Sequence, residues 1–161
     1  NNNFKIVLKE KNSLSLINPQ LPQLFNSIRR KGVKICLNTE YNTEIQNSII
    51  DKLNMKSFID DYVSSQDVNR GRPYSDMIDL LSEKHNISHS SIIKFGDSKN
   101  DICEGKNSLC LASVGVVSGS YNEQLLIKHN PDLIMNSVMD IEIDTTFNDL
   151  LENTLKKYTI H

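Results

Sequence analysis

Short apolar runs alternate along the chain with stretches in which apolar residues recur every three or four positions. The short runs predict strands at residues 4–8, 33–37, 62–64, 92–95, 111–117 and 133–135. The helical spacing predicts helices at residues 19–30, 43–53, 75–85, 100–106, 122–129 and 147–158, with Thr43 expected to cap the second. This alternation is typical of an α/β fold with a mainly parallel sheet and helices on both faces. No repeat or long linker interrupts it, so one domain over residues 1–161 is expected.

Composition narrows the class of protein and of partner. The chain has 161 residues, of which 38% are hydrophobic and 24% charged, and its net charge is −2. No broad basic field favours a nucleic acid or an anionic membrane as partner. No apolar run approaches the roughly 20 residues of a membrane helix, and no signal peptide is visible, so a cytoplasmic protein is expected. Cys36, Cys103 and Cys110 form an odd set without CxxC spacing, which favours neither disulfides nor a zinc site.

The strongest chemical signal is the segment Gly96-Asp97-Ser98-Lys99-Asn100-Asp101, which follows the apolar run 92–95. Glycine turns the chain where the strand ends, and Asp101 falls at the start of the next predicted helix. Open α/β sheets bind ligands at the carboxyl ends of their strands. Two carboxylates at that edge are suitable ligands for Mg²⁺. A magnesium site at Asp97 and Asp101 is therefore predicted.

Three further marks lie at or near the ends of predicted elements. The strand at 33–37 runs on through Asn38 to the hydroxyl of Thr39, and Gly71-Arg72-Pro73 places a cation ahead of a helix. Residues 114–120 form a strand followed by a loop of small residues. With the carboxylates of Asp97 and Asp101, these marks follow one another in order along the chain.

The motifs Leu37-Asn38-Thr39, Gly71-Arg72-Pro73 and Gly96-Asp97-Ser98 resemble the haloacid dehalogenase (HAD) superfamily, and within it the phosphonatase-like branch. The resemblance runs from about residue 20 to about residue 138. It implies a three-layer, Rossmann-like core with a parallel sheet. It also implies that Asn38, Thr39 and Arg72 bind phosphate, and that Asp97 and Asp101 serve a Mg²⁺ site.

One part of the family pattern is missing. Members of the family attack phosphorus with an aspartate, which belongs to a motif of the form Asp-x-Asp-Gly-Thr after the first strand. In this chain Lys9 stands at the position of that nucleophile, and Lys11 stands at the position of the second aspartate. Either the motif is degenerate, or the chain is a fragment whose true motif lies upstream. The segment 140–146 holds two aspartates, but no apolar strand precedes it, so it is not a displaced copy.

The lysines suggest three alternatives. An ammonium near the metal position would pair with Asp97 and Asp101 and replace the metal. Alternatively, Lys9 would join Arg72 and Thr39 in an anion pocket without turnover. A Schiff-base role for Lys9 would need a lowered pKa, to which Lys11 would contribute as a cationic neighbour.

Two departures from the family pattern favour lost catalysis. Only a few residues separate Ser13 from the helix at 19–30, so no sizeable cap is expected, and Glu40 follows Asn38-Thr39 where the family has glycine. An acidic side chain there would repel a phosphorylated ligand. Simpler structural roles stay open: Thr39 as a turn residue, Arg72 as a surface cation and Asp101 as a carboxylate at a helix N-terminus.

The sequence therefore favours a HAD-like hydrolase-fold protein that is catalytically degenerate and binds phosphate, a small phosphorylated ligand or a protein partner. The alternative is a Mg²⁺-dependent phosphatase or phosphonatase-type hydrolase whose aspartate nucleophile lies outside this chain. A third hypothesis is a structural module that binds another protein. Whether the chain is an enzyme is left open.

Overall fold

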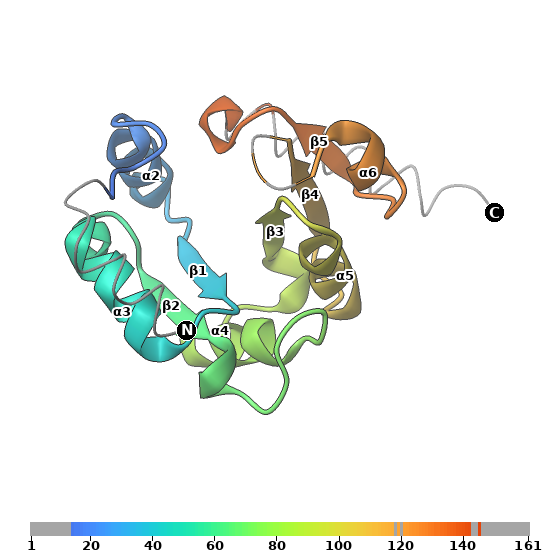
Figure 1. Ribbon diagram of the computed structural model, residues 1–161, viewed down its shortest axis with the longest axis horizontal. Helices are drawn as coiled ribbons and strands as arrows, with labels where there is room; N and C mark the ends of the chain where they lie inside the picture. The colour runs from blue at the N-terminus through green and yellow to red at the C-terminus, as the bar shows by residue number, and fades with distance from the viewer. Residues whose placement is uncertain (1–13, 118, 120, 143–144, 146–161) are drawn as a thin grey trace. The chain divides into compact units, whose positions relative to one another are not determined.

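The computed structural model describes residues 14–117, 119, 121–142 and 145. The chain divides into two compact units, Asn1–Asn69 and Arg70–His161, and each is described by itself (Figure 1). The single domain expected from the sequence stays a prediction.

The first unit contains a pair of parallel strands and two helices. Its elements are α2 (Leu21–Arg30), β1 (Cys36–Thr39), α3 (Thr43–Lys52) and β2 (Asp61–Ser64), with 3₁₀ turns at Met55–Ser57 and Ser65–Asp67. β1 pairs with β2 in parallel, so that Thr39 lies opposite Ser64. The core of this unit includes Phe25 and Phe58, whose ring centres are 6.1 Å apart.

Two details of the first unit differ from the prediction. The strand begins at Cys36 and not at residue 33, because the preceding backbone is tied to Asp60: the N–H of Ile35 donates to the Asp60 carboxylate at 2.8 Å. Thr43 does not cap α3, and that prediction is wrong. The cap is Asn42, whose side-chain oxygen accepts a hydrogen bond from the N–H of Ile45 at 2.8 Å.

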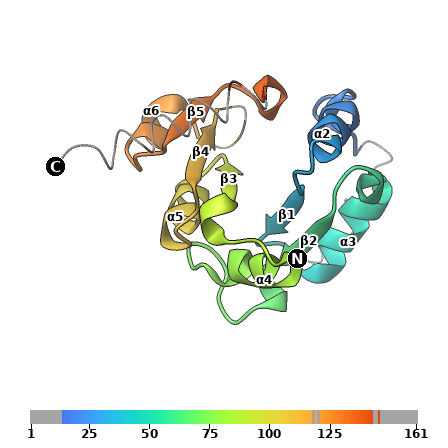
Figure 2. The same ribbon diagram turned by 180° about the vertical axis from the view of Figure 1, so that it is seen from behind.

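The second unit contains a three-stranded parallel sheet. Its elements are α4 (Asp76–His85), β3 (Ile93–Gly96), α5 (Lys99–Asn107), β4 (Ala112–Val116), α6 (Glu123–Ile127) and β5 (Leu133–Met135), with 3₁₀ turns at His89–Ser91 and Val138–Asp140. The strand order is β3-β4-β5, so β4 is central, and all of its residues are buried. α5 packs against β3 and β4, as both views show (Figures 1 and 2).

The predicted class of fold is confirmed. The chain is an α/β protein in which every strand pairing between described residues is parallel. The described strands form two sheets, one in each unit. The predicted strand 4–8 and the predicted helix 147–158 lie outside the described residues. No helix among the described residues is long and apolar enough to cross a membrane.

Candidate functional site

The turn from β3 into α5 brings the predicted motif together. Gly96 ends the strand, and a Cβ atom at this position would overlap the side chain of Asp101, so only glycine leaves room for that carboxylate. Ser98 caps α5: its hydroxyl accepts from the N–H of Asp101 at 3.3 Å and donates to Asp101 Oδ2 at 2.5 Å. The cap therefore fixes both the helix start and the carboxylate.

Asp101 binds two cations. Its Oδ1 accepts a hydrogen bond from Arg72 Nη1, and it lies 3.1 Å from Lys94 Nζ. Only 3% of the Asp101 surface is exposed. A buried carboxylate requires such partners to stay ionised.

These partners determine the ionisation of Asp101. Burial by itself would raise its pKa, but the charge of Lys94, the hydrogen bond from Ser98 and the charge of Arg72 together lower the pKa below its ordinary value of 3.8. Asp101 is therefore an anion at neutral pH, and it anchors the guanidinium of Arg72.

The loop that carries Arg72 is held at several points. The N–H of Tyr74 donates to the carbonyl of Gly71 at 3.1 Å, which closes a turn around the cis Arg72–Pro73 bond. Asn107, at the end of α5, donates to the carbonyl of Pro73 at 2.8 Å. Contacts from Asp101 and Asn107 of α5 therefore hold the Arg72 loop in place. The Arg72 side chain is only 15% exposed, unlike that of a surface cation.

Sequence reasoning missed Lys94 and Glu104. Lys94 lies within β3, is 8% exposed and places its Nζ 2.9 Å from Oε2 of Glu104, which is fully buried in α5. The available signal was a lysine in the middle of an otherwise apolar strand. Such a residue is rarely buried unless a carboxylate faces it.

Asp97 lies directly after β3, as predicted, and is half-buried. The N–H of Tyr121 donates to its backbone carbonyl at 3.1 Å. A Cβ atom at Gly119 would overlap the Asp97 side chain, so the small-residue loop after β4 passes close to this carboxylate. Gly119 therefore has a steric reason to be glycine.

The remaining predicted site residues belong to the first unit or lie outside the described residues. Asn38 and Thr39 are the last two residues of β1, in the first unit. Thr39 Oγ1 accepts from the N–H of Tyr41 at 3.2 Å, which agrees with the turn role left open for this residue. Lys9 and Lys11 are outside the described residues. The phosphate roles of Asn38 and Thr39 stay predictions.

The described carboxylates fit a magnesium ion only in part. Among the described residues, no three His, Cys, Asp or Glu side chains are arranged to hold a metal ion. Asp101 already binds Arg72, Lys94 and Ser98. Asp97 directly follows β3, and Mg²⁺ needs only one or two protein carboxylates when a phosphoryl group and water complete its shell.

One of the three cysteines, Cys110, is poorly suited to act as a nucleophile. Cys36, Cys103 and Cys110 form no disulfide. Burial, followed by the charge of Glu104, raises the pKa of Cys110 to about 12. This cysteine therefore stays protonated near neutral pH, and a protonated thiol is a poor nucleophile.

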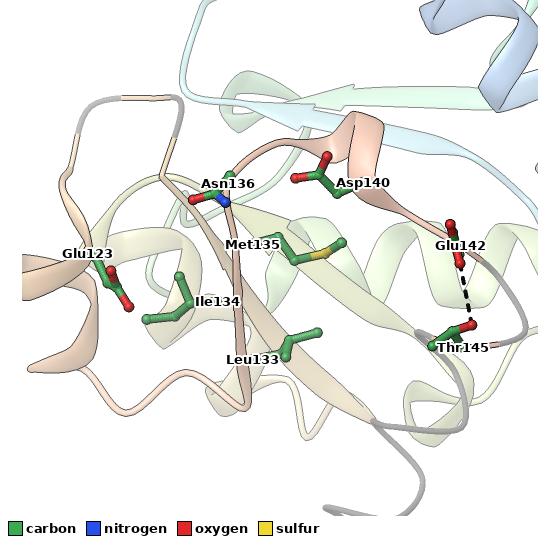
Figure 3. A pocket seen from close by; sticks show the side chains of 8 residues that line it. All are labelled: Glu123, Leu133, Ile134, Met135, Asn136, Asp140, Glu142 and Thr145. Atoms are coloured by element: carbon green, nitrogen blue, oxygen red, sulfur yellow. Dashed lines mark hydrogen bonds between the residues drawn. The ribbon is translucent and has the colours of Figure 1, made fainter.

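An open pocket of about 530 Å³ lies beside β5 and is lined by side chains that include Leu133, Met135, Glu123, Asp140 and Glu142 (Figure 3). Its three carboxylates give it a negative character, which disfavours an anionic ligand. None of its lining residues belongs to the ion pairs around Asp101. The pocket and the charged turn after β3 are therefore separate features.

Proteins with an open parallel α/β sheet typically bind their ligands at the carboxyl ends of the strands, and the turn with Asp97 and Asp101 lies at such an end. A model of the family described as haloacid dehalogenase-like hydrolase matches residues 2–116, and the chain belongs to this family. The superfamily predicted from the motifs is therefore confirmed.

Curated relatives include two proteins named phosphoglycolate phosphatase. That of Vibrio parahaemolyticus is 25% identical over 128 residues, which are 80% of this chain and 56% of the relative. That of Escherichia coli strain K12 is 25% identical over 123 residues, 76% of this chain and 48% of the relative. The chain thus spans about half the length of these proteins.

Solved structures show the same fold. A HAD hydrolase of family IA, variant 3, from Entamoeba histolytica has a TM-score of 0.80 at 18% identity, covering 93% of this chain and 67% of its own. A phosphonoacetaldehyde hydrolase like protein from Oleispira antarctica has a TM-score of 0.78 at 21% identity, covering 94% and 62%. At these identities the likeness concerns the fold.

Proposed function

We propose that this chain binds phosphate, or the phosphoryl group of a small phosphorylated ligand, at the turn after β3. The observation that carries the proposal is the Arg72 guanidinium held by the buried carboxylate of Asp101. An arginine fixed in this way keeps its charge at every physiological pH and suits the oxygens of a phosphoryl group.

Asp97 is the residue that would hold Mg²⁺ in this site. When bound, the ion supplies positive charge that offsets the negative charge of the phosphoryl oxygens. The roles of this chain's own residues are simpler: Arg72 attracts and orients the anion, and Asp101 fixes Arg72. The contribution of Asn38 and Thr39, and a metal role for Asp101, stay predictions from the sequence.

In this proposal the chain alone does not turn its ligand over. The family's aspartate nucleophile has no counterpart at the aligned positions, where Lys9 and Lys11 stand. Without a carboxylate to attack phosphorus, the covalent intermediate of the family cannot form. The phosphonatase-like branch, a protein partner and a cytoplasmic location also remain proposals, which only the sequence supports.

A second candidate is a Mg²⁺-dependent phosphatase of small phosphorylated substrates whose nucleophile lies outside this chain. The curated relatives favour it, since both of those described above are named phosphoglycolate phosphatase. Their identity of 25% and the coverage of about half their length make the substrate a matter for experiment.

Isothermal titration of the 161-residue chain with inorganic phosphate tests the first candidate. Arg72→Gln is expected to weaken phosphate binding about tenfold or more, because a charge-assisted contact is lost. Arg70→Gln is the matched control, since Arg70 is an exposed arginine two positions away that pairs with Asp76. Failure of the wild type to bind phosphate, or equal losses in both variants, would contradict the proposal.

A parallel assay separates the two candidates. The chain is incubated with MgCl₂ and either p-nitrophenyl phosphate or phosphoglycolate, and the release of p-nitrophenol or inorganic phosphate is followed. Hydrolysis by the chain itself would show that a nucleophile lies within it and would contradict the first candidate. The same assay on a longer product of the gene, which includes the sequence upstream, tests the second candidate. Phosphate binding without hydrolysis in both proteins supports the first candidate, and hydrolysis by the longer protein that Asp97→Asn abolishes would replace it by the second.

A further inference from the structure

A buried cluster of charges lies behind Arg72. It consists of Lys94, Asp101 and Glu104, and we call it the Lys94 cluster. Lys94 Nζ lies 3.1 Å from Asp101 Oδ1 and 2.9 Å from Glu104 Oε2. The exposed fractions of the three residues are 8%, 3% and 0%. The lysine therefore joins the carboxylate that binds Arg72 to a second carboxylate deeper in the unit.

Close packing of α5 on the sheet creates this arrangement. Lys94 of β3 lies opposite Ser113 of β4 in the parallel register. A Cβ atom at Gly105 of α5 would overlap Ser113 Oγ and lie 2.8 Å from Lys94 Cβ. The helix reaches this depth because residue 105 has no side chain, and the neighbouring Glu104 is thereby brought to the ammonium.

The cluster is unlike an ordinary stabilising ion pair. Removing charges from water is costly, and well-packed apolar residues often replace buried ion pairs without loss of stability. Ser113 Oγ is also buried and has no hydrogen-bond partner among the described residues, so this part of the interior is polar beyond what the sheet requires. A role in positioning another charged side chain explains these buried polar groups better than a contribution to stability does.

We infer that Lys94 is a positioning residue for the anion site: its ammonium holds the Asp101 carboxylate from the interior side, and Asp101 in turn holds the guanidinium of Arg72. The inference deepens the proposed phosphate site and rests on it. Lys94 shares the single negative charge of Asp101 with Arg72, so Arg72 keeps more of its attraction for an external anion than in an isolated pair. Glu104 balances the remaining positive charge in the interior.

The test removes both interior charges together. Lys94→Met with Glu104→Gln leaves the net charge unchanged and leaves no buried ammonium or carboxylate unpaired by the substitution. The matched control is Lys128→Met with Glu123→Gln, which exchanges the same residue types on and next to α6, where both are exposed. Each protein is the full 161-residue chain.

The first measurement needs no ligand. The Nε–Hε signal of Arg72, assigned by its absence from the Arg72→Lys spectrum, is compared between wild type and the two double variants. The inference expects this signal to shift and its hydrogen exchange to become about tenfold faster in Lys94→Met/Glu104→Gln alone. An unchanged Arg72 signal in a folded variant would overturn the inference.

The second measurement is the affinity for inorganic phosphate. A loss of about tenfold is expected for Lys94→Met/Glu104→Gln, with the control within about threefold of wild type. If wild type binds no phosphate, the proposed function fails, and the Arg72 signal alone decides the role of Lys94. Should the double variant not fold, Lys94→Arg decides: retention of the Arg72 signal and of phosphate affinity supports the inference, and loss of both overturns it.

Discussion

The side chain of Asp101 binds three partners at once, Arg72, Lys94 and Ser98. A carboxylate in this position was predicted from the spacing Asp97-x-x-x-Asp101, which places it at the start of a helix after a strand. The sequence predicted other partners for Asp101, namely Mg²⁺ or a lysine of the segment that holds Lys9 and Lys11. The structure gives Asp101 two cations from its own unit.

Asp101→Asn is expected to lower the free energy of unfolding by about 3 kcal/mol, since it leaves two cations facing a neutral group in a buried site. Urea denaturation followed by circular dichroism measures the change. Asp51→Asn is the control, because Asp51 forms an exposed ion pair with Lys56 and is expected to change stability by less than about 1 kcal/mol. Equal effects of the two substitutions would show that the buried pairs contribute little.

Lys94 and Glu104 show where sequence reasoning stopped. In the pattern, Lys94 is one polar position in an apolar run, and Glu104 is one of several charged residues in a polar helix. Their meeting depends on the register of β3 against β4 and on the missing side chain at Gly105. Both are long-range features, which a local pattern of hydrophobicity does not contain.

At the scale of elements, the helices and strands followed the apolar pattern closely. Residues 75–85 were predicted as a helix, and α4 is Asp76–His85. Residues 133–135 were predicted as a strand, and β5 has these bounds. Two predicted boundaries were wrong because of side-chain hydrogen bonds. The N–H of Ile35 donates to Asp60, so β1 begins later than predicted, at Cys36. Asn42, and not Thr43, caps α3.

The turn between β3 and α5 requires glycine at position 96, whereas the glycine opposite it in β4, Gly115, is less strictly required. Gly96 and Gly115 are register partners in neighbouring strands. A methyl group at Gly96 overlaps Asp101, whereas at Gly115 its nearest neighbour is the end of the flexible Leu126 side chain at 3.3 Å. Gly96→Ala is therefore expected to cost about 2 kcal/mol more than Gly115→Ala in thermal or urea unfolding. Equal costs would mean that Asp101 moves freely.

The cap of α3 is testable by two adjacent substitutions. Asn42→Ala removes the acceptor for the Ile45 N–H and is expected to destabilise the protein by about 1 kcal/mol. Thr43→Ala removes no cap and is expected to have the smaller effect. A larger loss for Thr43→Ala in urea denaturation would restore the original prediction from the sequence.

At the scale of the whole molecule, the family was recognisable from three short motifs, and the family match over residues 2–116 confirms it. The finer branch and the substrate were not reachable in the same way. They depend on the nucleophile segment and on parts of the relatives that this chain does not match, since it spans about half of their length.

Acid is expected to destabilise both units. Asp60 in the first unit has a lowered pKa: burial opposes ionisation, but the N–H of Ile35 and the guanidinium of Arg29 outweigh it. In the second unit, Lys94, Ser98 and Arg72 lower the pKa of Asp101 against the opposite effect of burial. Because both folded pKa values lie below the unfolded ones, their stabilisation is complete above about pH 5 and is lost as the pH falls through the folded pKa values.

Urea titrations at several pH values between about 2 and 6 measure this loss. Asp101→Asn is expected to flatten the dependence, since one of the two carboxylates no longer titrates. An equally steep dependence in that variant would show that Asp101 is not ionised by its neighbours.

The balance of charges around Asp101 has a consequence for how this protein can evolve. Two cations, Arg72 and Lys94, face two carboxylates, Asp101 and Glu104, with little access to water. A single substitution at any of the four leaves one charge without its counterpart, whereas a paired substitution removes both. We expect the effects of substitutions here to be strongly non-additive. During evolution these four positions are therefore expected to change in compensating pairs. A change at one position is expected to be tolerated only when its partner changes with it.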